Sequence, residues 1–304
     1  MKPARTEQRN PRSRGLDRKS TLEILRALNR EDARVAPAVR RELPAIAQAV
    51  DAIVKAIGAG GRLFYVGAGT SGRLAVLDAA ECPPTFGTPP EMVQAIIAGG
   101  ARALQHASEG AEDSAAGGAR DLRRAGLTSK DVVVGIAASG TTPYVLGALA
   151  HAKRMGAVTV GVTANPRSPV ARAAKIAIAP DTGPEAVSGS TRLKAGTAQK
   201  LVLNLLSTAA MARLGRVYEN WMVHVALTNQ KLRRRGVRIL QEATGASAST
   251  AEHAVRQPGN DLAAALVMLK ADVSAPEAQK RLAATGGNVR KALEYARDGK
   301  RTRA

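Results

Sequence analysis

Two glutamates in the sequence combine the residue type and the surroundings needed for acid–base chemistry. Glu81 lies in residues 78–85 and Glu112 in residues 109–113, and each follows a polar loop that contains glycine and could hold a phosphate. Paired carboxylates act as general acid and general base when their environments separate their pKa values. The pair therefore suggests acid–base chemistry on a phosphorylated small molecule. Taken alone, two helix-end or surface carboxylates would look the same.

The first candidate phosphate loop, residues 67–73, follows an apolar run and precedes a helix-length segment. Glycines let the backbone approach a ligand, hydroxyls donate hydrogen bonds, and a helix N-terminus attracts anions. The spacing matches neither a dinucleotide fingerprint nor a P-loop, because the third glycine comes one place early and no Gly-Lys-Ser/Thr ending follows. A plain strand-to-helix turn is the alternative. The candidate ligand contacts are Gly69, Thr70, Ser71 and Gly72.

Two further runs of hydroxyl residues and glycine repeat this arrangement. One precedes Pro143, and the other, residues 188–191, precedes Lys194. Loops of this kind at the ends of strands would converge on one ligand. Lys194 could close the site with a point charge, and an exposed helix lysine is the alternative. The other candidate ligand contacts in these two runs are Ser139, Gly140, Thr141, Thr142 and Ser190.

The elements that must position these loops follow an α/β pattern. Short, almost wholly apolar runs alternate with helix-length segments, which is typical of a parallel sheet covered on both faces. Ligands bind such sheets beyond the carboxyl ends of the strands, where the helices begin. The loops after the first three runs are therefore the expected site. The runs are residues 63–66, 93–97, 132–137, 158–162 and 176–178.

Helical patterns occupy both ends of the chain. Ser20 and Glu23 have the spacing of a capping box that opens a helix through Asn29, and helical periodicity continues over 31–57 with interruptions at Pro37 and Pro44. Three parts are expected: an N-terminal helical segment (1–58), a sheet domain with its long helices (59–236) and a C-terminal helical module (237–304). The later helices are predicted at 197–214, 217–234, 250–256, 261–269, 276–284 and 289–296.

The composition is that of a folded protein with a basic surface. The chain has 304 residues, 45% apolar content and a formal charge of +20. Nucleic-acid binding is not the expected explanation, since aromatics make up only 2% and the basic residues are dispersed. A solvated basic surface is the expected explanation, and a weaker effect is that a positive field would attract an anionic sugar phosphate. No run approaches the roughly 20 apolar residues of a membrane span, so no membrane association is expected.

Neither a metal nor a cofactor is expected, because the four histidines lack the spacing of metal ligands: His106, His151, His224 and His253. The N-terminal arginines are not followed by an apolar block, and Cys82 is the single cysteine. A single thiol cannot build a disulfide framework. The predicted location is cytoplasmic.

At this point the residues resemble a known family. Four long and distinctive segments, 63–74, 81–85, 109–113 and 189–200, are closely similar to N-acetylmuramic acid 6-phosphate etherases, and the similarity extends over nearly the whole chain. The resemblance implies a sugar isomerase (SIS) type αβα sandwich and a homodimer with its active site near the subunit interface. It also implies cleavage of the lactyl ether of N-acetylmuramic acid 6-phosphate to N-acetylglucosamine 6-phosphate and D-lactate in cell-wall recycling.

The resemblance implies elimination followed by hydration. Opening the sugar ring exposes a C1 aldehyde that acidifies the C2 proton; a carboxylate removes that proton, a carboxylic acid protonates the departing oxygen, and water then adds back. Glu81 is assigned as the acid and Glu112 as the base, with the reverse assignment left open. An acid of this kind needs burial or a neighbouring negative charge to stay protonated near neutral pH.

The chain departs from the family pattern in two places. Thr141 stands where the family usually has arginine, and residues 219–225 carry Glu219, Trp221 and His224 at unusual positions. Two rival functions remain: a phosphosugar isomerase of the same fold, which should not need both glutamates, and a non-enzymatic phosphosugar sensor. The glucokinase regulatory protein is such a sensor, but it has two SIS-type domains. A transcriptional regulator would need a helix-turn-helix that residues 1–58 do not predict.

Overall fold

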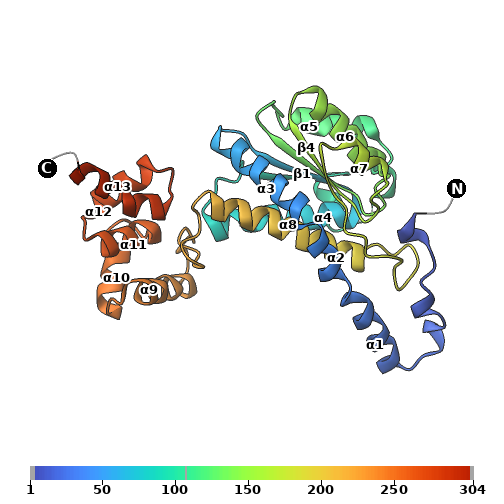
Figure 1. The fold of residues 1–304 in the computed structure, drawn as a ribbon, viewed down its shortest axis with the longest axis horizontal. Coiled ribbons are helices and arrows are strands. Elements are labelled where there is room, and N and C mark those ends of the chain that lie inside the picture. Colours follow the sequence, from blue (N-terminus) through green and yellow to red (C-terminus); the bar gives the residue numbers. More distant parts are fainter. Residues whose placement is uncertain (1–3, 107, 302–304) are drawn as a thin grey trace. The chain divides into compact units, whose positions relative to one another are not determined.

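The fold is built around a parallel β-sheet. The computed structural model describes residues 4–106 and 108–301 (Figure 1). Within them, five strands align in the order β2-β1-β3-β4-β5, and each neighbouring pair is parallel. The predicted strands and their parallel arrangement are confirmed. The strands are β1 (Leu63–Gly67), β2 (Val93–Ile97), β3 (Val132–Ile136), β4 (Val158–Val162) and β5 (Ile176–Ile178).

The carboxyl ends of the first three strands finish level with one another. The last residue of β1, Gly67, pairs with Ile97 of β2 on one side and with Ile136 of β3 on the other. Both β1 and β3 are buried along their whole length, which explains their uninterrupted apolar sequences. The strand order reverses at β1, and α/β sheets bind ligands at such switch points. The loops that follow β1, β2 and β3 therefore share one edge.

Helices cover both faces of this sheet and give three layers. Figure 1 shows α3, α4 and α8 along one face and α5, α6 and α7 along the other. The expected αβα sandwich is confirmed. The helices that surround the sheet are α1 (Thr21–Asp32), α2 (Val35–Arg41), α3 (Leu43–Gly58), α4 (Gly69–Phe86), α5 (Ala115–Arg124), α6 (Pro143–Arg154), α7 (Pro169–Ala173) and α8 (Lys194–Arg213).

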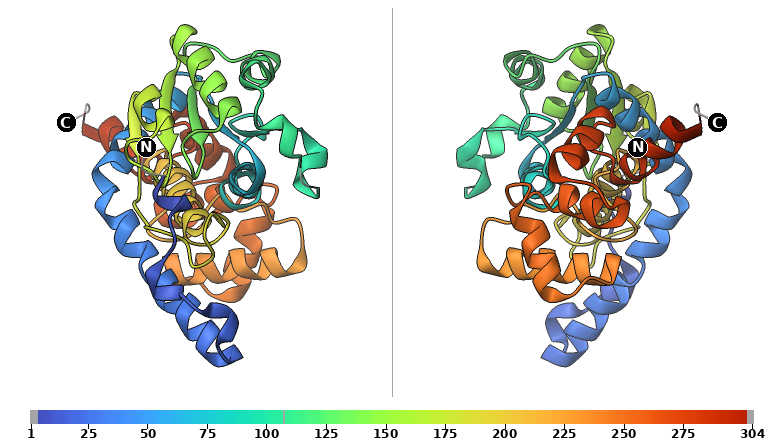
Figure 2. Two further views of the ribbon diagram at one scale, coloured as in Figure 1. Left: turned by 90° about the vertical axis from the view of Figure 1, so that its right-hand side faces the viewer. Right: turned by 90° about the vertical axis from the view of Figure 1, so that its left-hand side faces the viewer.

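The N-terminal region is helical, as predicted. Ser20 and Glu23 form the capping box of α1, and short 3-10 turns η1 (Arg5–Glu7), η2 (Pro11–Ser13) and η3 (Leu16–Arg18) precede it. Pro37 and Pro44 lie in the first turns of α2 and α3, where the missing N–H is tolerated. Figure 2 shows α1 extending away from the sheet, and Leu22 and Leu25 are more than half exposed on it.

The chain forms two compact units. The first extends to Ala80 and resumes over Pro90–Thr208, and it contains the sheet; the second comprises Glu81–Pro89 and the chain from Ala209 onward. The second unit contains the last five helices of the described chain, which pack around their own apolar core. These are α9 (Gln230–Thr244), α10 (Ala248–Arg256), α11 (Leu262–Ala271), α12 (Ala275–Ala284) and α13 (Val289–Arg301).

The helix predicted over 217–234 is wrong. Tyr218 and Trp221 pair through an isolated β-bridge, and Glu219 between them has a left-handed φ of 53° that a helix does not allow. The helix α9 begins only after Asn229, whose side chain accepts a hydrogen bond from the Leu232 backbone N–H at 2.9 Å. The expected domain boundary at 236 consequently falls inside α9. The helices predicted after residue 249 are present.

An internal repeat underlies the second unit and was not found from the sequence. The pair α10–α11 and the pair α12–α13 repeat at a spacing of 27 positions, from Ser247 to Ser274, the two serines that precede α10 and α12. Each pair turns at a glycine with positive φ, 72° at Gly259 and 62° at Gly286. The next helix then starts at a side chain, Asp261 or Asn288, that accepts a backbone N–H. The last four helices of the described chain are thus two copies of one helix–turn–helix pattern, and α9 precedes them.

Among the described residues, no helix is long and apolar enough to cross a membrane.

Candidate active site

The loop after β1 brings candidate phosphate ligands to the start of α4. Gly69 opens the helix with a φ of 52°, and Gly69 and Thr70 are accessible there. Gly72 serves packing instead, because a Cβ at this position would lie 2.5 Å from the Ile97 side chain and 2.9 Å from the Gly67 carbonyl oxygen. The buried Ser71 hydroxyl donates to Gln199 Oε1 at 2.9 Å. Sequence reasoning did not identify Gln199.

The loop after β3 is held by a side chain that sequence reasoning also missed. The Asn165 amide donates to the carbonyl oxygens of Ala138 (3.2 Å) and Ser139 (2.9 Å). Gly140 has a φ of 73°, and a Cβ there would lie 2.2 Å from Ser168 Oγ. The rigid backbone leaves the Ser139 and Thr141 hydroxyls 2.9 Å apart at the surface.

Thr142 occupies the N-cap position of α6, immediately before Pro143. Its side chain makes no capping hydrogen bond within the described chain, and the residue is half-buried. A hydroxyl at a helix N-terminus that is not used for capping is available to a ligand, and the helix potential there favours an anion.

The Glu112 segment reaches the same edge of the sheet. The Glu112 carbonyl oxygen accepts a hydrogen bond from the Tyr144 N–H in the first turn of α6 at 2.9 Å, which places Glu112 beside the loop that carries Thr142. The Glu112 side chain is exposed. The segment preceding it is anchored by Arg73 of α4, whose guanidinium donates to the carbonyl oxygens of Ala103, Leu104 and His106, all at 3.1 Å.

Helix α8 runs parallel to α4 and adds a third helix N-terminus to this edge. Gly196 of α8 lies against Thr70, since a Cβ added to the glycine would be 3.6 Å from Thr70 Cγ2. Further along, the Asp78 carboxylate of α4 accepts hydrogen bonds from Asn204 (2.7 Å) and Ser207 (3.1 Å) of α8. The half-buried Ser190 precedes α8. The structure therefore brings the first and second loops, Glu112 and the Ser190 run to one edge.

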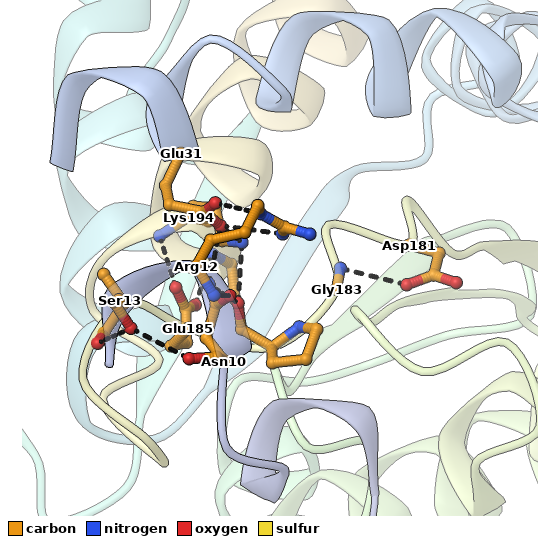
Figure 3. A network of polar contacts seen from close by, with 11 residues as sticks. Asn10, Arg12, Ser13, Glu31, Asp181, Gly183, Glu185 and Lys194 are labelled. Atoms are coloured by element: carbon orange, nitrogen blue, oxygen red, sulfur yellow. Dashed lines mark hydrogen bonds and ion pairs between the residues drawn. The ribbon is translucent and has the colours of Figure 1, made fainter. Parts of the chain in front are cut away.

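Lys194 has a different role from the one expected. Its side chain is 1% exposed, and its ammonium donates to Glu31 Oε2 at 2.5 Å and to the Pro184 carbonyl oxygen at 2.7 Å (Figure 3). An ammonium that is buried against a carboxylate cannot supply a free positive charge to a phosphate. Lys194 is therefore a structural residue that fixes the start of α8, and the prediction that it closes the site is corrected.

Figure 3 shows the polar network around this lysine. Glu31 of α1 also accepts hydrogen bonds from the Arg12 guanidinium and from Asn10 Nδ2 (2.8 Å). The pKa of Glu31 is lowered to about 2, chiefly by the hydrogen bond from Arg12 and, against the effect of burial, by those from Lys194 and Asn10.

The buried Glu185 carboxylate secures the start of α8 from the other side. It accepts the backbone N–H groups of Lys194 (3.1 Å) and Ala195 (2.9 Å), and burial raises its pKa. The start of α8 is thus tied to the N-terminal segment and to residues 184–185.

Glu81 belongs to the second unit, although it lies within α4. Its side chain is exposed, and the neighbouring Cys82 is buried. Among the described residues, no group of three or more His, Cys, Asp or Glu side chains could hold a metal ion.

Comparisons with known proteins agree with this architecture. Residues 45–153 match the model of the glucokinase regulatory protein N-terminal SIS domain. The chain is 57% identical over 288 residues to an N-acetylmuramic acid 6-phosphate etherase of Serratia proteamaculans (strain 568), covering 95% of this chain and 97% of that protein. A protein of the same name from Pectobacterium atrosepticum is 53% identical, with 95% of each chain covered. The chain belongs to the N-acetylmuramic acid 6-phosphate etherase family.

Among solved structures, a phosphoheptose isomerase from Francisella tularensis is 19% identical, with a TM-score of 0.49, and covers 63% of this chain and 98% of its own.

Within the etherase family, the unusual residues of this chain mostly serve packing in the second unit. Trp221 stacks on Tyr218 with ring centroids 6.4 Å apart, and Glu219 forms an ion pair with Arg290 at 2.6 Å. His224 Nε2 lies 2.8 Å from the Gly287 carbonyl oxygen, and burial lowers its pKa. The remaining departure, Thr141, is exposed in the loop after β3.

Proposed function

We propose that this protein cleaves the D-lactyl ether of N-acetylmuramic acid 6-phosphate with water to give N-acetylglucosamine 6-phosphate and D-lactate. It would thus be a carbon–oxygen lyase of amino-sugar recycling that acts in the cytoplasm. The observation that carries the proposal is the identity to etherases over 95% of the chain. The convergence of two hydroxyl loops and Glu112 at the carboxyl edge of the sheet supports it, because that edge is where a phosphosugar would bind.

The phosphate would be held without Lys194. The proposed ligands are the accessible start of α4, at Gly69 and Thr70, with the Ser71 hydroxyl, and the loop after β3 with Ser139, Gly140, Thr141 and Thr142. Ser190 would approach from the start of α8. The N-termini of α4 and α6 at one edge favour a bound dianion, whereas the N-terminus of α8 already holds the Glu185 carboxylate. Because the phosphate does not react, its binding energy can position the sugar and favour the open-chain form.

Glu112 would remove the C2 proton, and Glu81 would protonate the departing ether oxygen and then activate the water that adds at C3. Each positioned acid or base typically contributes about 10²–10⁴-fold to the rate. The reaction in deuterated water distinguishes the two roles. Glu112→Gln should abolish both lactate release and deuterium exchange at C2, whereas Glu81→Gln should release no lactate but still exchange. The opposite result would show that Glu81 is the base and Glu112 the acid.

We infer that the protein acts as a homodimer, and that Glu81 of one subunit acts at the phosphate loops of its partner. Glu81, Leu22 and Leu25 are exposed in the single chain, and a partner would cover such groups.

Mixing two inactive variants tests the shared site. If Glu81 acts in the partner's site, refolding Glu81→Gln together with Glu112→Gln produces heterodimers in which one of two sites is intact, with roughly a quarter of the wild-type activity. If both glutamates act within one chain, the mixture stays inactive.

The decisive experiment for the function itself is the release of D-lactate from N-acetylmuramic acid 6-phosphate by the purified wild type. The reaction in heavy-oxygen water should place the label at C3 of the sugar, because lactate leaves with the original ether oxygen. A folded protein that releases no lactate, but interconverts an aldose and a ketose phosphate, would be an isomerase instead. Phosphosugar binding without turnover would identify a sensor.

A further inference from the structure

Gln199 is a buried amide that contacts the proposed phosphate site through a single side chain. It lies in the second turn of α8, is 2% exposed, and accepts the Ser71 hydroxyl proton on Oε1 at 2.9 Å. Its other amide atom, Nε2, has no hydrogen-bond partner among the described residues. An unpaired buried amide N–H₂ is costly, so its retention calls for an explanation.

The amide can adopt two orientations about its terminal bond, and each makes one hydrogen bond to Ser71. In the observed orientation, Ser71 donates to Oε1, so its hydroxyl proton cannot donate to a ligand. A half-turn of the amide places Nε2 toward Ser71 Oγ, so that Gln199 donates and the Ser71 proton is free to point elsewhere. Each orientation pairs one amide atom and leaves the other unpaired. A ligand that interacts with only one orientation would therefore select it.

We propose that Gln199 is a positioning residue that converts the Ser71 hydroxyl into a hydrogen-bond donor to the phosphate of the substrate. The inference rests on the proposed function. A phosphate dianion offers only acceptors, so it favours the orientation in which Gln199 donates to Ser71 and Ser71 donates to the phosphate. The contribution matters because Lys194, the lysine expected at the site, is paired with Glu31 and does not supply a donor to the anion.

The variant Gln199→Glu tests the donor requirement. At pH 8 its carboxylate can only accept, so it holds the Ser71 proton away from the phosphate. We expect the affinity for N-acetylglucosamine 6-phosphate to fall by roughly 10- to 100-fold, the value of one hydrogen bond to a charged group. Burial at this position should raise the pKa of the introduced carboxyl, so that near pH 5 a larger fraction is protonated and can donate to Ser71. The ratio of wild-type to variant affinity should therefore narrow. A purely structural role for Gln199 would not produce this pH dependence.

Two comparisons complete the test. Lys200→Gln removes one positive charge at the next, exposed position of α8, so it matches the change in net charge and should bind like the wild type. Gln199→Met lacks both donor and acceptor, and its effect should vanish when Ser71 is already alanine, because Gln199 acts through Ser71.

Isothermal titration measures each affinity, and matching circular dichroism spectra show that each variant is folded. The proposal is overturned if Gln199→Glu binds like the wild type at pH 8, or if the loss is unchanged at pH 5. It is also overturned if Gln199→Met weakens binding equally with and without Ser71. A wild type that does not bind the phosphosugar would contradict the proposed function instead, and this arm is measured first.

Discussion

Replacing Lys194 by methionine tests whether this buried lysine is structural. The change removes the ammonium and keeps a side chain of similar length. It eliminates two hydrogen bonds, to Glu31 Oε2 at 2.5 Å and to the Pro184 carbonyl oxygen at 2.7 Å. The Glu31 carboxylate keeps its hydrogen bonds from Arg12 and Asn10, so it is not left unpaired. We therefore expect the free energy of unfolding of the first unit to fall by about 3 kcal/mol. This value lies between that of one hydrogen bond to a charged group and the cost of fully breaking a buried ion pair.

The loss should depend on pH in a defined direction. The pKa of Glu31 is about 2 in the folded protein, against an ordinary 4.5, with the Arg12 hydrogen bond as the largest cause. A lowered carboxyl pKa stabilises the folded state above the unfolded pKa, and the contribution is lost as pH falls through the folded pKa. Because Lys194 supplies part of the shift and Arg12 is retained, the pKa of Glu31 in the folded variant should lie between about 2 and 4.5. The difference in stability between wild type and variant should be full at pH 7 and shrink as pH falls from the variant's folded pKa to about 2.

Amide hydrogen exchange of α1 and α8 is the appropriate assay, because it reports local stability in the unit concerned. Trp221, the single tryptophan, lies in the other unit and would report the wrong transition. Lys200→Met, an exposed change on the same helix, is the control and should alter stability by less than about 0.5 kcal/mol. A loss for Lys194→Met below about 1 kcal/mol at pH 7, or one that has not begun to shrink when the pH reaches about 2, would refute the reasoning.

Three further changes test the rest of the framework. Arg73→Met should lower kcat about tenfold or more while the protein stays folded, because Arg73 anchors the segment that precedes Glu112; unchanged kcat and C2 exchange would contradict this. Asp78→Asn should destabilise the first unit by about 2 kcal/mol in thermal unfolding, since the amide oxygen can still accept Asn204 and Ser207 but the amide N–H₂ replaces the oxygen that accepts the buried Tyr65 hydroxyl. Gly118→Ala should cost about 1–3 kcal/mol or more, because its Cβ would lie 2.0 Å from the Tyr144 carbonyl oxygen, whereas Gly110→Ala, with open space, should cost little.

The sequence predicted the sheet and most helices because their signals are local. Runs such as 132–137 are apolar at every position, as strands covered on both faces must be. The helix predicted over 217–234 failed because its apolar residues serve a bridge between Tyr218 and Trp221 and the core of the second unit. The 27-position repeat escaped notice because its shared residues are mostly small apolar side chains, caps and turn glycines.

The sequence by itself determined the family, the order of strands along the chain, and the candidate glutamates and hydroxyl loops, because each of these is written in adjacent residues. Only the tertiary structure decided which groups are available to a ligand. In the folded chain, Lys194 pairs with Glu31, Gln199 accepts a hydrogen bond from Ser71, and Gly72 packs against Ile97. Such roles depend on residues more than a hundred positions apart, such as Ser71 and Gln199. Burial and hydrogen-bond partners arise only when those residues are packed together.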